Sequence, residues 1–349
     1  MRNISFHFLL AFLTLSILNS PPVKAQEAPI NFHLIKKTIL GGEGGWDFIA
    51  IDGQHRRLYI AHNDEVIVYN LDADTVMRRI PNTNGSHGIA IAERERNGFI
   101  TCGKSNSVLM FSLVNYDTIQ RIPVGEKPDA IIYDFFSAHV FVMNANSNSL
   151  TVLDAFKGTV LKTIQLPGNP EFGVADEHGH VYVNIEDKSE VARINSYNDS
   201  LEGVFHIGSG EGPTGIGMDR GKQRLFIGCA NEKLIVMDAK KMKVIQTLKI
   251  GKGCDAVAFD PIWNLAYASC GDGTVTIARE TAAELLENGQ TLQTQRGART
   301  MDIDPKTHNI YLVTAEFGAT PEPTKDKPHP RQAILPGTLT VLEYGEDKP

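Results

Sequence analysis

The stretch "WDFIAID", residues 46–52, is the first of seven similar stretches that are spread along the chain. The six others are "SHGIAIA" (86–92), "PDAIIYD" (128–134), "PEFGVAD" (170–176), "PTGIGMD" (213–219), "CDAVAFD" (254–260) and "ARTMDID" (298–304). The second positions of successive copies are 40 to 44 residues apart. A period this narrow over most of a chain is typical of a repeat architecture.

Each repeat continues with three more segments of strand character. In the third repeat these are "VFVMN" (140–144), "LTVLD" (150–154) and "VLKTIQL" (160–166), separated by turns rich in Gly, Asn, Asp and Ser. Four strands per period, without a helix, predict an all-β fold: a seven-bladed β-propeller with four strands in each blade. The blade repeats are expected to start near residues 45, 85, 127, 169, 212, 253 and 297.

The two ends of the repeat region complement each other. The last repeat stops after its third strand, "GTLTVLEY" (337–344), whereas "HLIKKTIL" (33–40) has the pattern of a fourth strand. We therefore expect the N-terminal strand to complete the last blade and close the ring, which removes exposed sheet edges. A pair of β-sandwiches is the alternative fold, but it does not explain seven equal periods.

Residues 1–25 have the character of a secretory signal peptide. Arg2 precedes an apolar run, and Val23-Lys24-Ala25 resembles a cleavage site before Gln26. The alternative, a membrane anchor, would require a longer apolar run. We expect cleavage to leave a single propeller domain over 26–349, without a membrane span, in the periplasm or secreted.

Composition is that of a globular protein, with 42% hydrophobic and 21% charged residues. Removal of the signal takes away two basic residues and no acidic one, so the net charge changes from −7 to −9. This balance argues against a nucleic-acid partner, because phosphate backbones attract basic surfaces. We expect a monomer.

The repeat resembles the YVTN-type repeat of secreted bacterial YncE-like β-propellers. The similar segments are "FVMNANSNSLTVLDAFKGTVLKTIQLPG" (141–168), "YVNIEDKSEVARIN" (182–195) and "LFIGCANEKLIVMDAKKMKVIQTLKIG" (225–251). The resemblance covers roughly 33–345, although no copy spells YVTN. It implies a seven-bladed propeller outside the cytoplasm but no single activity, because similar propellers include binding proteins, lactonases and redox enzymes.

The second position of each copy differs from blade to blade while its surroundings agree. We call these residues the head residues: Asp47, His87, Asp129, Glu171, Thr214, Asp255 and Arg299. Inner strands of a propeller start at the mouth of the central channel, so we expect the head residues to converge there. Such an asymmetric set suits a ligand site, and solvated strand ends paired among themselves are the alternative. Trp46 could contact the same ligand, or simply pack between blades.

Six acids near the ends of the inner strands have a different explanation. They precede turn residues in nearly every copy, so we expect them to stabilise turns. They are Asp52, Asp134, Asp176, Asp219, Asp260 and Asp304.

A long Pro-rich segment, 316–337, interrupts the last blade. It could fold over the mouth as a partial lid, which would bring Glu316, Phe317, His329 and Arg331 toward a ligand, or it could be disordered.

Three cysteines, Cys229, Cys254 and Cys270, fall on one face of neighbouring blades. We expect at most one disulfide, within these three, with Cys102 free; four free thiols are the alternative.

Two function classes remain open. The favoured one is a non-catalytic propeller that binds a small polar ligand, a cation such as Ca²⁺, or a protein partner at the channel mouth. The alternative is a hydrolase or lyase that acts on a sugar or lactone, in which neighbouring acids serve as acid and base. No certain cofactor follows from the sequence, since it contains no C-x-x-C-H haem motif, H-E-x-x-H motif or phosphate-binding glycine loop.

Overall fold

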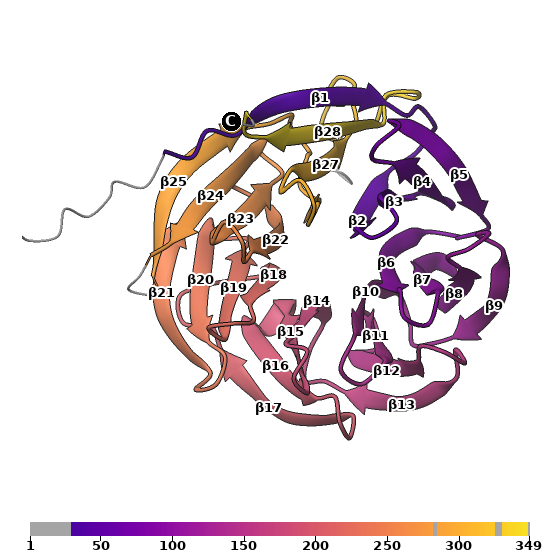
Figure 1. The fold of residues 1–349 in the computed structure, drawn as a ribbon, viewed down its shortest axis with the longest axis vertical. Coiled ribbons are helices and arrows are strands. Elements are labelled where there is room, and N and C mark those ends of the chain that lie inside the picture. The colour runs from indigo at the N-terminus through magenta and orange to yellow at the C-terminus, as the bar shows by residue number, and fades with distance from the viewer. Residues whose placement is uncertain (1–28, 282–284, 325–329, 348–349) are drawn as a thin grey trace, which may run out of the picture.

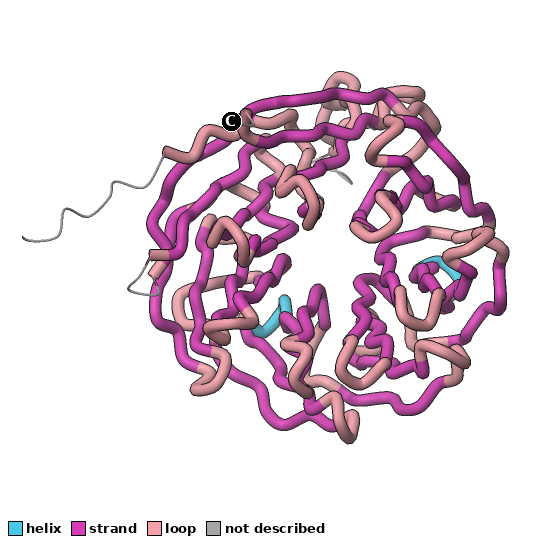
Figure 2. The backbone as a smooth tube through the Cα atoms, in the orientation of Figure 1, coloured by secondary structure: helices cyan, strands magenta, loops and turns pink. Residues whose placement is uncertain are grey.

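The computed structural model describes residues 29–281, 285–324 and 330–347. The expected signal peptide and His329 lie outside these ranges. Seven four-stranded antiparallel sheets form a ring around a central channel, which confirms the predicted propeller (Figure 1). Apart from strands and loops, the described residues form two short 3₁₀ helices, Gly103–Ser105 and Glu186–Lys188 (Figure 2). Neither is long and apolar enough to cross a membrane.

Each blade contributes one strand to the channel and three strands progressively farther out. The inner strands are β2 (Trp46–Asp52), β6 (Ser86–Ala92), β10 (Pro128–Asp134), β14 (Pro170–Ala175), β18 (Pro213–Asp219), β22 (Cys254–Asp260) and β26 (Met301–Ile303). The second strands are β3 (Arg57–His62), β7 (Asn97–Cys102), β11 (His139–Asn144), β15 (His180–Ile185), β19 (Arg224–Cys229), β23 (Leu265–Cys270) and β27 (Ile310–Thr314).

The third strands are β4 (Glu65–Asn70), β8 (Ser107–Ser112), β12 (Ser149–Asp154), β16 (Glu190–Asn195), β20 (Lys233–Asp238), β24 (Thr274–Glu280) and β28 (Thr340–Gly345). The outer strands are β5 (Thr75–Pro81), β9 (Thr118–Pro123), β13 (Val160–Gln165), β17 (Ser200–His206), β21 (Lys243–Lys249), β25 (Leu286–Gln293) and β1 (His33–Ile39).

The N-terminal strand closes the ring as predicted. Strand β1 pairs antiparallel with β28, from His33 opposite Gly345 to Ile39 opposite Thr340. The blade built from the C-terminal repeat therefore receives its fourth strand from the other end of the described chain. This arrangement joins the two ends by hydrogen bonds that the seven repeats alone would lack.

The hydrophobic core lies between blades, because each blade packs its faces against its neighbours. One cluster joins Tyr59 and Val68 of the first blade to Ile100 and Phe111 of the second, and all four side chains are almost fully buried. The second and third strands are buried over most of their lengths, whereas the outer strands are mostly exposed. This pattern explains the near-continuous apolar runs of the sequence.

The six acids near the inner-strand ends stabilise turns, as predicted. Each carboxylate accepts a hydrogen bond from a backbone N–H two or three residues later; Asp176, for example, accepts from His178 at 2.7 Å. All six are buried, so these contacts replace the water that the carboxylates lose. The donors are the N–H groups of His55, Phe136, His178, Gly221, Ile262 and Lys306.

Candidate functional site

A bulge at the start of the inner strand positions the head residues. In β2 and β3, Trp46 pairs with His62 and Ile49 pairs with Ile60, so Asp47 and Phe48 together face a single residue, Ala61. A β-bulge bends the strand and re-aims the side chain of the extra residue. The same one-residue shift occurs at the head residue of six blades. The repeat pattern of the sequence locates this position but does not reveal the bulge.

Hydrogen bonds between neighbouring blades fix the backbone at the head residues. Thr101 Oγ1 donates to the carbonyl of Asp129 at 2.5 Å, and Asn184 Nδ2 donates to the carbonyl of Thr214 at 2.8 Å. Thr300 Oγ1 donates to the carbonyl of Asp47 at 3.0 Å. These side chains tie each blade to the next at the level of the site. None of the three was predicted as a site residue, although Thr101 and Asn184 share a sequence signal: each is a polar residue one place before the end of a second strand.

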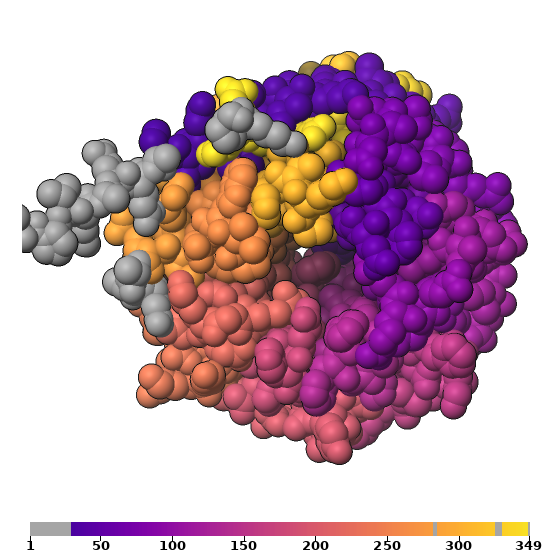
Figure 3. Space-filling view, viewed as in Figure 1, coloured from indigo at the N-terminus to yellow at the C-terminus, as the bar shows by residue number. Residues whose placement is uncertain are grey.

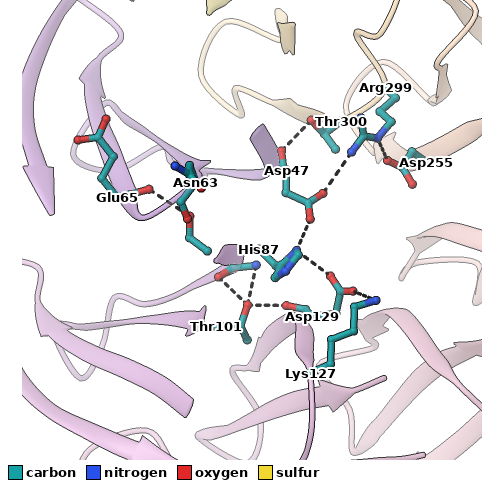
Figure 4. A network of polar contacts seen from close by, with 12 residues as sticks. Asp47, Asn63, Glu65, His87, Thr101, Lys127, Asp129, Asp255, Arg299 and Thr300 are labelled. Atoms are coloured by element: carbon teal, nitrogen blue, oxygen red, sulfur yellow. Dashed lines mark hydrogen bonds and ion pairs between the residues drawn. The ribbon is translucent and has the colours of Figure 1, made fainter. Parts of the chain in front are cut away.

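Five head residues form one connected network (Figure 4). His87 Nδ1 lies 2.5 Å from Asp47 Oδ2 and 3.4 Å from Asp129 Oδ1. Arg299 Nε donates to the carboxylate of Asp255, and Arg299 Nη2 lies 3.7 Å from Asp47 Oδ1. The structure therefore brings Asp47, His87, Asp129, Asp255 and Arg299 together around one opening.

Burial and charge change the titration of these groups. Burial raises the pKa of Asp129 despite the nearby His87, and it raises the pKa of Asp255 despite Arg299. The pKa of His87 is also raised, because the hydrogen bond and charges of Asp47 and Asp129 outweigh the desolvation that opposes them. The two carboxylates therefore favour the protonated form of the imidazole that lies between them.

Glu171 lies within the electrostatic field of the same network but differs from the other head residues. Burial, followed by the charges of Asp129, Glu186, Asp255 and Asp47, raises its pKa to about 9. No hydrogen bond or ion pair of its side chain occurs among the described residues. A protonated carboxyl is therefore the expected form at neutral pH.

Two aromatic rings help to explain the desolvation of the mouth. Phe48 and Phe172 directly follow Asp47 and Glu171, and their rings stack with centroids 4.9 Å apart, although they come from the first and fourth blades. The rings therefore fill part of the channel beside the charged groups. The space-filling view shows the hollow at the centre of the ring (Figure 3).

The remaining predicted site residues have other surroundings. Thr214 Oγ1 donates to the carbonyl of Cys254, so its hydroxyl joins two blades. Trp46 is only 6% exposed and packs among residues of the first and last blades. Glu316 is exposed, and its backbone N–H donates to Thr338 Oγ1 at 3.0 Å.

The two described arms of the long segment, 316–324 and 330–337, come together near the mouth. Phe317 pairs with Ile334 across an isolated antiparallel bridge, and Gly318 donates to Ala333 at 2.8 Å. Phe317 also lies against Trp46, with ring centroids 6.0 Å apart. The described arms are thus anchored to the first blade, at the edge of the head-residue network.

All four cysteines are buried free thiols. Cys254 and Cys270 are direct partners across β22 and β23, yet they are not bonded. Burial raises the pKa of Cys229 to about 12, so its thiol is a poor nucleophile at neutral pH. Of the two expectations for the cysteines, four free thiols is the one that agrees with the structure.

Comparison with known proteins identifies the fold but no family. No protein-family model and no curated protein sequence matches the chain. Its structure is similar to a chain of "Kuenenia stuttgartiensis Hydrazine Synthase", with a TM-score of 0.67 and 12% identity, covering 83% of this chain and 95% of that chain. It is also similar to U3-55K, with a TM-score of 0.72 and 8% identity, covering 90% and 99%. At these identities the likeness shows the propeller fold alone.

Proposed function

We propose that the protein is a non-catalytic binding propeller that holds a divalent metal ion at the channel mouth through Asp47, His87 and Asp129. The observation that carries the proposal is geometric: one ligand atom from each residue lies within 4.8 Å of the others. Two carboxylate oxygens and one imidazole nitrogen leave coordination positions for a small polar ligand or water. The metal would thereby supply the binding point for the polar ligand that the sequence predicted.

The donor set favours a first-row transition ion such as Zn²⁺ or Mn²⁺. Ca²⁺, the candidate from the sequence, prefers oxygen ligands only, whereas an imidazole nitrogen suits transition ions. Nδ1 of His87 faces both carboxylates, so a metal ion would take the place of the proton held there. Lys127 Nζ lies 3.4 Å from Asp129 Oδ2 but is half-exposed and can move away.

Titration of the purified protein with Zn²⁺, Mn²⁺ and Ca²⁺ by calorimetry tests the proposal. We expect one site, with affinity at least about tenfold lower in Asp129→Asn and His87→Asn, since each variant removes one ligand. Asp199→Asn is the matched control, because Asp199 also pairs with a histidine, His139 at 3.0 Å, but lies outside the network. Unchanged affinity in both site variants would refute the proposal.

Export and family membership belong to the same proposal. The apolar N-terminal segment supports a periplasmic or secreted protein, and the repeat pattern supports a YVTN-type, YncE-like propeller. Cell fractionation with an N-terminal sequence of the recovered protein tests export: Gln26 as the first residue agrees, and an uncleaved chain in the cytoplasm contradicts it.

The alternative function is a hydrolase or lyase acting on a sugar or lactone, and the observation that favours it is Glu171. A carboxyl with a pKa near 9 can donate a proton at neutral pH, as a general acid must. Turnover of a lactone or glycoside that Glu171→Gln abolishes, while metal affinity is unchanged, would favour this alternative over binding alone.

A further inference from the structure

A cavity of about 770 Å³ lies directly beside the head-residue network. Its walls come from the start of the first blade, the segment just before β26, and the two described arms of the long segment. The lining residues used below are Trp46, Arg296, Arg299, Phe317, Arg331 and Gln332. A volume of this size accommodates a small organic molecule.

Positive charge dominates the polar part of this wall. Three guanidinium groups line the cavity, and only Arg299 has carboxylate partners, Asp255 and Asp47. Arg296 and Arg331 are exposed and form no ion pair among the residues that the structure describes. Their charges are therefore free to face a ligand, and guanidinium groups bind carboxylates and phosphates through paired hydrogen bonds.

Aromatic rings form the apolar part of the same wall. Trp46 and Phe317 contact each other, and each ring lies beneath an arginine: Arg299 is 5.9 Å from the Trp46 centroid and Arg296 is 5.3 Å from the Phe317 centroid. These contacts hold the guanidinium groups in place over the rings. The wall therefore places positive charge directly beside two aromatic side chains, of which Phe317 is the more exposed and Trp46 is only 6% exposed.

The wall also contains polar atoms that lack partners. Nε1 of Trp46 and Oε1 of Gln332 are buried and neither donate nor accept a hydrogen bond in the described ranges. An unsatisfied buried polar group costs free energy, and because both atoms are screened from solvent a ligand in the cavity would reach them only after a shift of neighbouring side chains. This observation is independent of the charge of the wall.

We propose that this cavity binds a small organic anion, a carboxylate or phosphate ester that carries a flat apolar group. The anionic group would lie between Arg296 and Arg331, and the apolar group against Trp46 and Phe317. This site is separate from the proposed metal centre, since neither Arg296 nor Arg331 contacts Asp47, His87 or Asp129. Arg299 connects the two sites through its ion pairs with Asp47 and Asp255.

Fluorescence of Trp46 tests the proposal with phenyl phosphate as the probe. The chain has two tryptophans, so a Trp263→Phe background leaves Trp46 as the only indole reporter. We expect saturable quenching by phenyl phosphate. Phenol and inorganic phosphate should bind at least about tenfold more weakly, because phenol lacks the anionic group and inorganic phosphate lacks the aromatic ring. Binding should persist in EDTA, because the cavity uses no metal.

Charge variants complete the test. Arg296→Gln combined with Arg331→Gln should weaken phenyl phosphate about tenfold or more while leaving Zn²⁺ affinity unchanged. Both side chains are exposed, so folding should not depend on them, and Arg78→Gln on the outer strand β5 is the control. Equal binding of phenol and phenyl phosphate, unchanged affinity in the double variant, or loss of binding in EDTA would each overturn the proposal. Because Zn²⁺ affinity is measured separately, these outcomes leave the proposed metal site untouched.

Discussion

Replacing Glu171 with Gln should make the protein more stable at alkaline pH and leave it unchanged at acidic pH. The folded chain raises the pKa of Glu171 from 4.5 to about 9 by burial and by the charges of Asp129, Glu186, Asp255 and Asp47. Between these two values the folded state keeps a proton that the unfolded state releases. The free energy of unfolding therefore decreases as pH rises through this window, and Gln removes the effect.

The size of the effect follows from the linkage between pKa and stability. A full proton difference changes the free energy of unfolding by about 1.4 kcal/mol per pH unit, or at most about 3 kcal/mol from pH 6 to pH 8. The side chain of Glu171 is only half-buried by surface area, and water at the mouth reduces the effect. We expect Glu171→Gln to gain about 1–2 kcal/mol relative to wild type over this range.

Urea unfolding of both proteins at a series of pH values measures this difference. Glu126→Gln is the control, because Glu126 is exposed on the neighbouring blade and only its backbone forms hydrogen bonds among the described residues. The control should follow wild type at every pH. Parallel curves for wild type and Glu171→Gln would refute the conclusion that Glu171 is protonated in the folded protein.

Three further predictions concern the blades, the ring and the metal. Thr101→Val should lower the free energy of unfolding by about 1–3 kcal/mol, because it leaves the buried carbonyl of Asp129 and the N–H of Gly88 without their hydrogen-bond partner. Urea unfolding measures this loss, and an unchanged unfolding midpoint would contradict the prediction. Deletion of 29–39 removes β1 and should lower the melting temperature sharply, whereas an equal melting temperature would contradict closure of the ring. The affinity for Zn²⁺ should decrease as the pH is lowered from about 8 to about 6, because the raised pKa of His87 makes a proton compete with the metal for the imidazole. A calorimetric affinity that does not depend on pH would exclude His87 as a ligand.

The fold was predictable because its determinants are local and repeated seven times. Each repeat has its own buried strand, its own turn and, in six copies, a turn acid such as Asp52 or Asp304, so the period alone indicates the blades. The closing role of "HLIKKTIL" also followed from the pattern, because one fourth strand was missing. The variable head position was visible for the same reason: the repeats align on both sides of it.

The parts of the site that the sequence did not reveal depend on contacts between strands of one blade or between blades. The bulge at Asp47 is a matter of register between two strands, and no single strand encodes it. The stacking of Phe48 on Phe172 crosses the channel between distant repeats. The sequence placed Arg331 near the mouth only on the condition that the long segment folds over it, because that segment has no counterpart in the other repeats from which the period could fix its position.

Anomalous diffraction from crystals soaked with Zn²⁺ or Mn²⁺ tests the central claim most directly. We predict a single strong anomalous peak at the channel mouth, within coordination distance of Asp47, His87 and Asp129, with the imidazole no longer hydrogen-bonded to the two carboxylates. A soaked crystal in which His87 still bridges Asp47 and Asp129, with no metal between them, would contradict the claim.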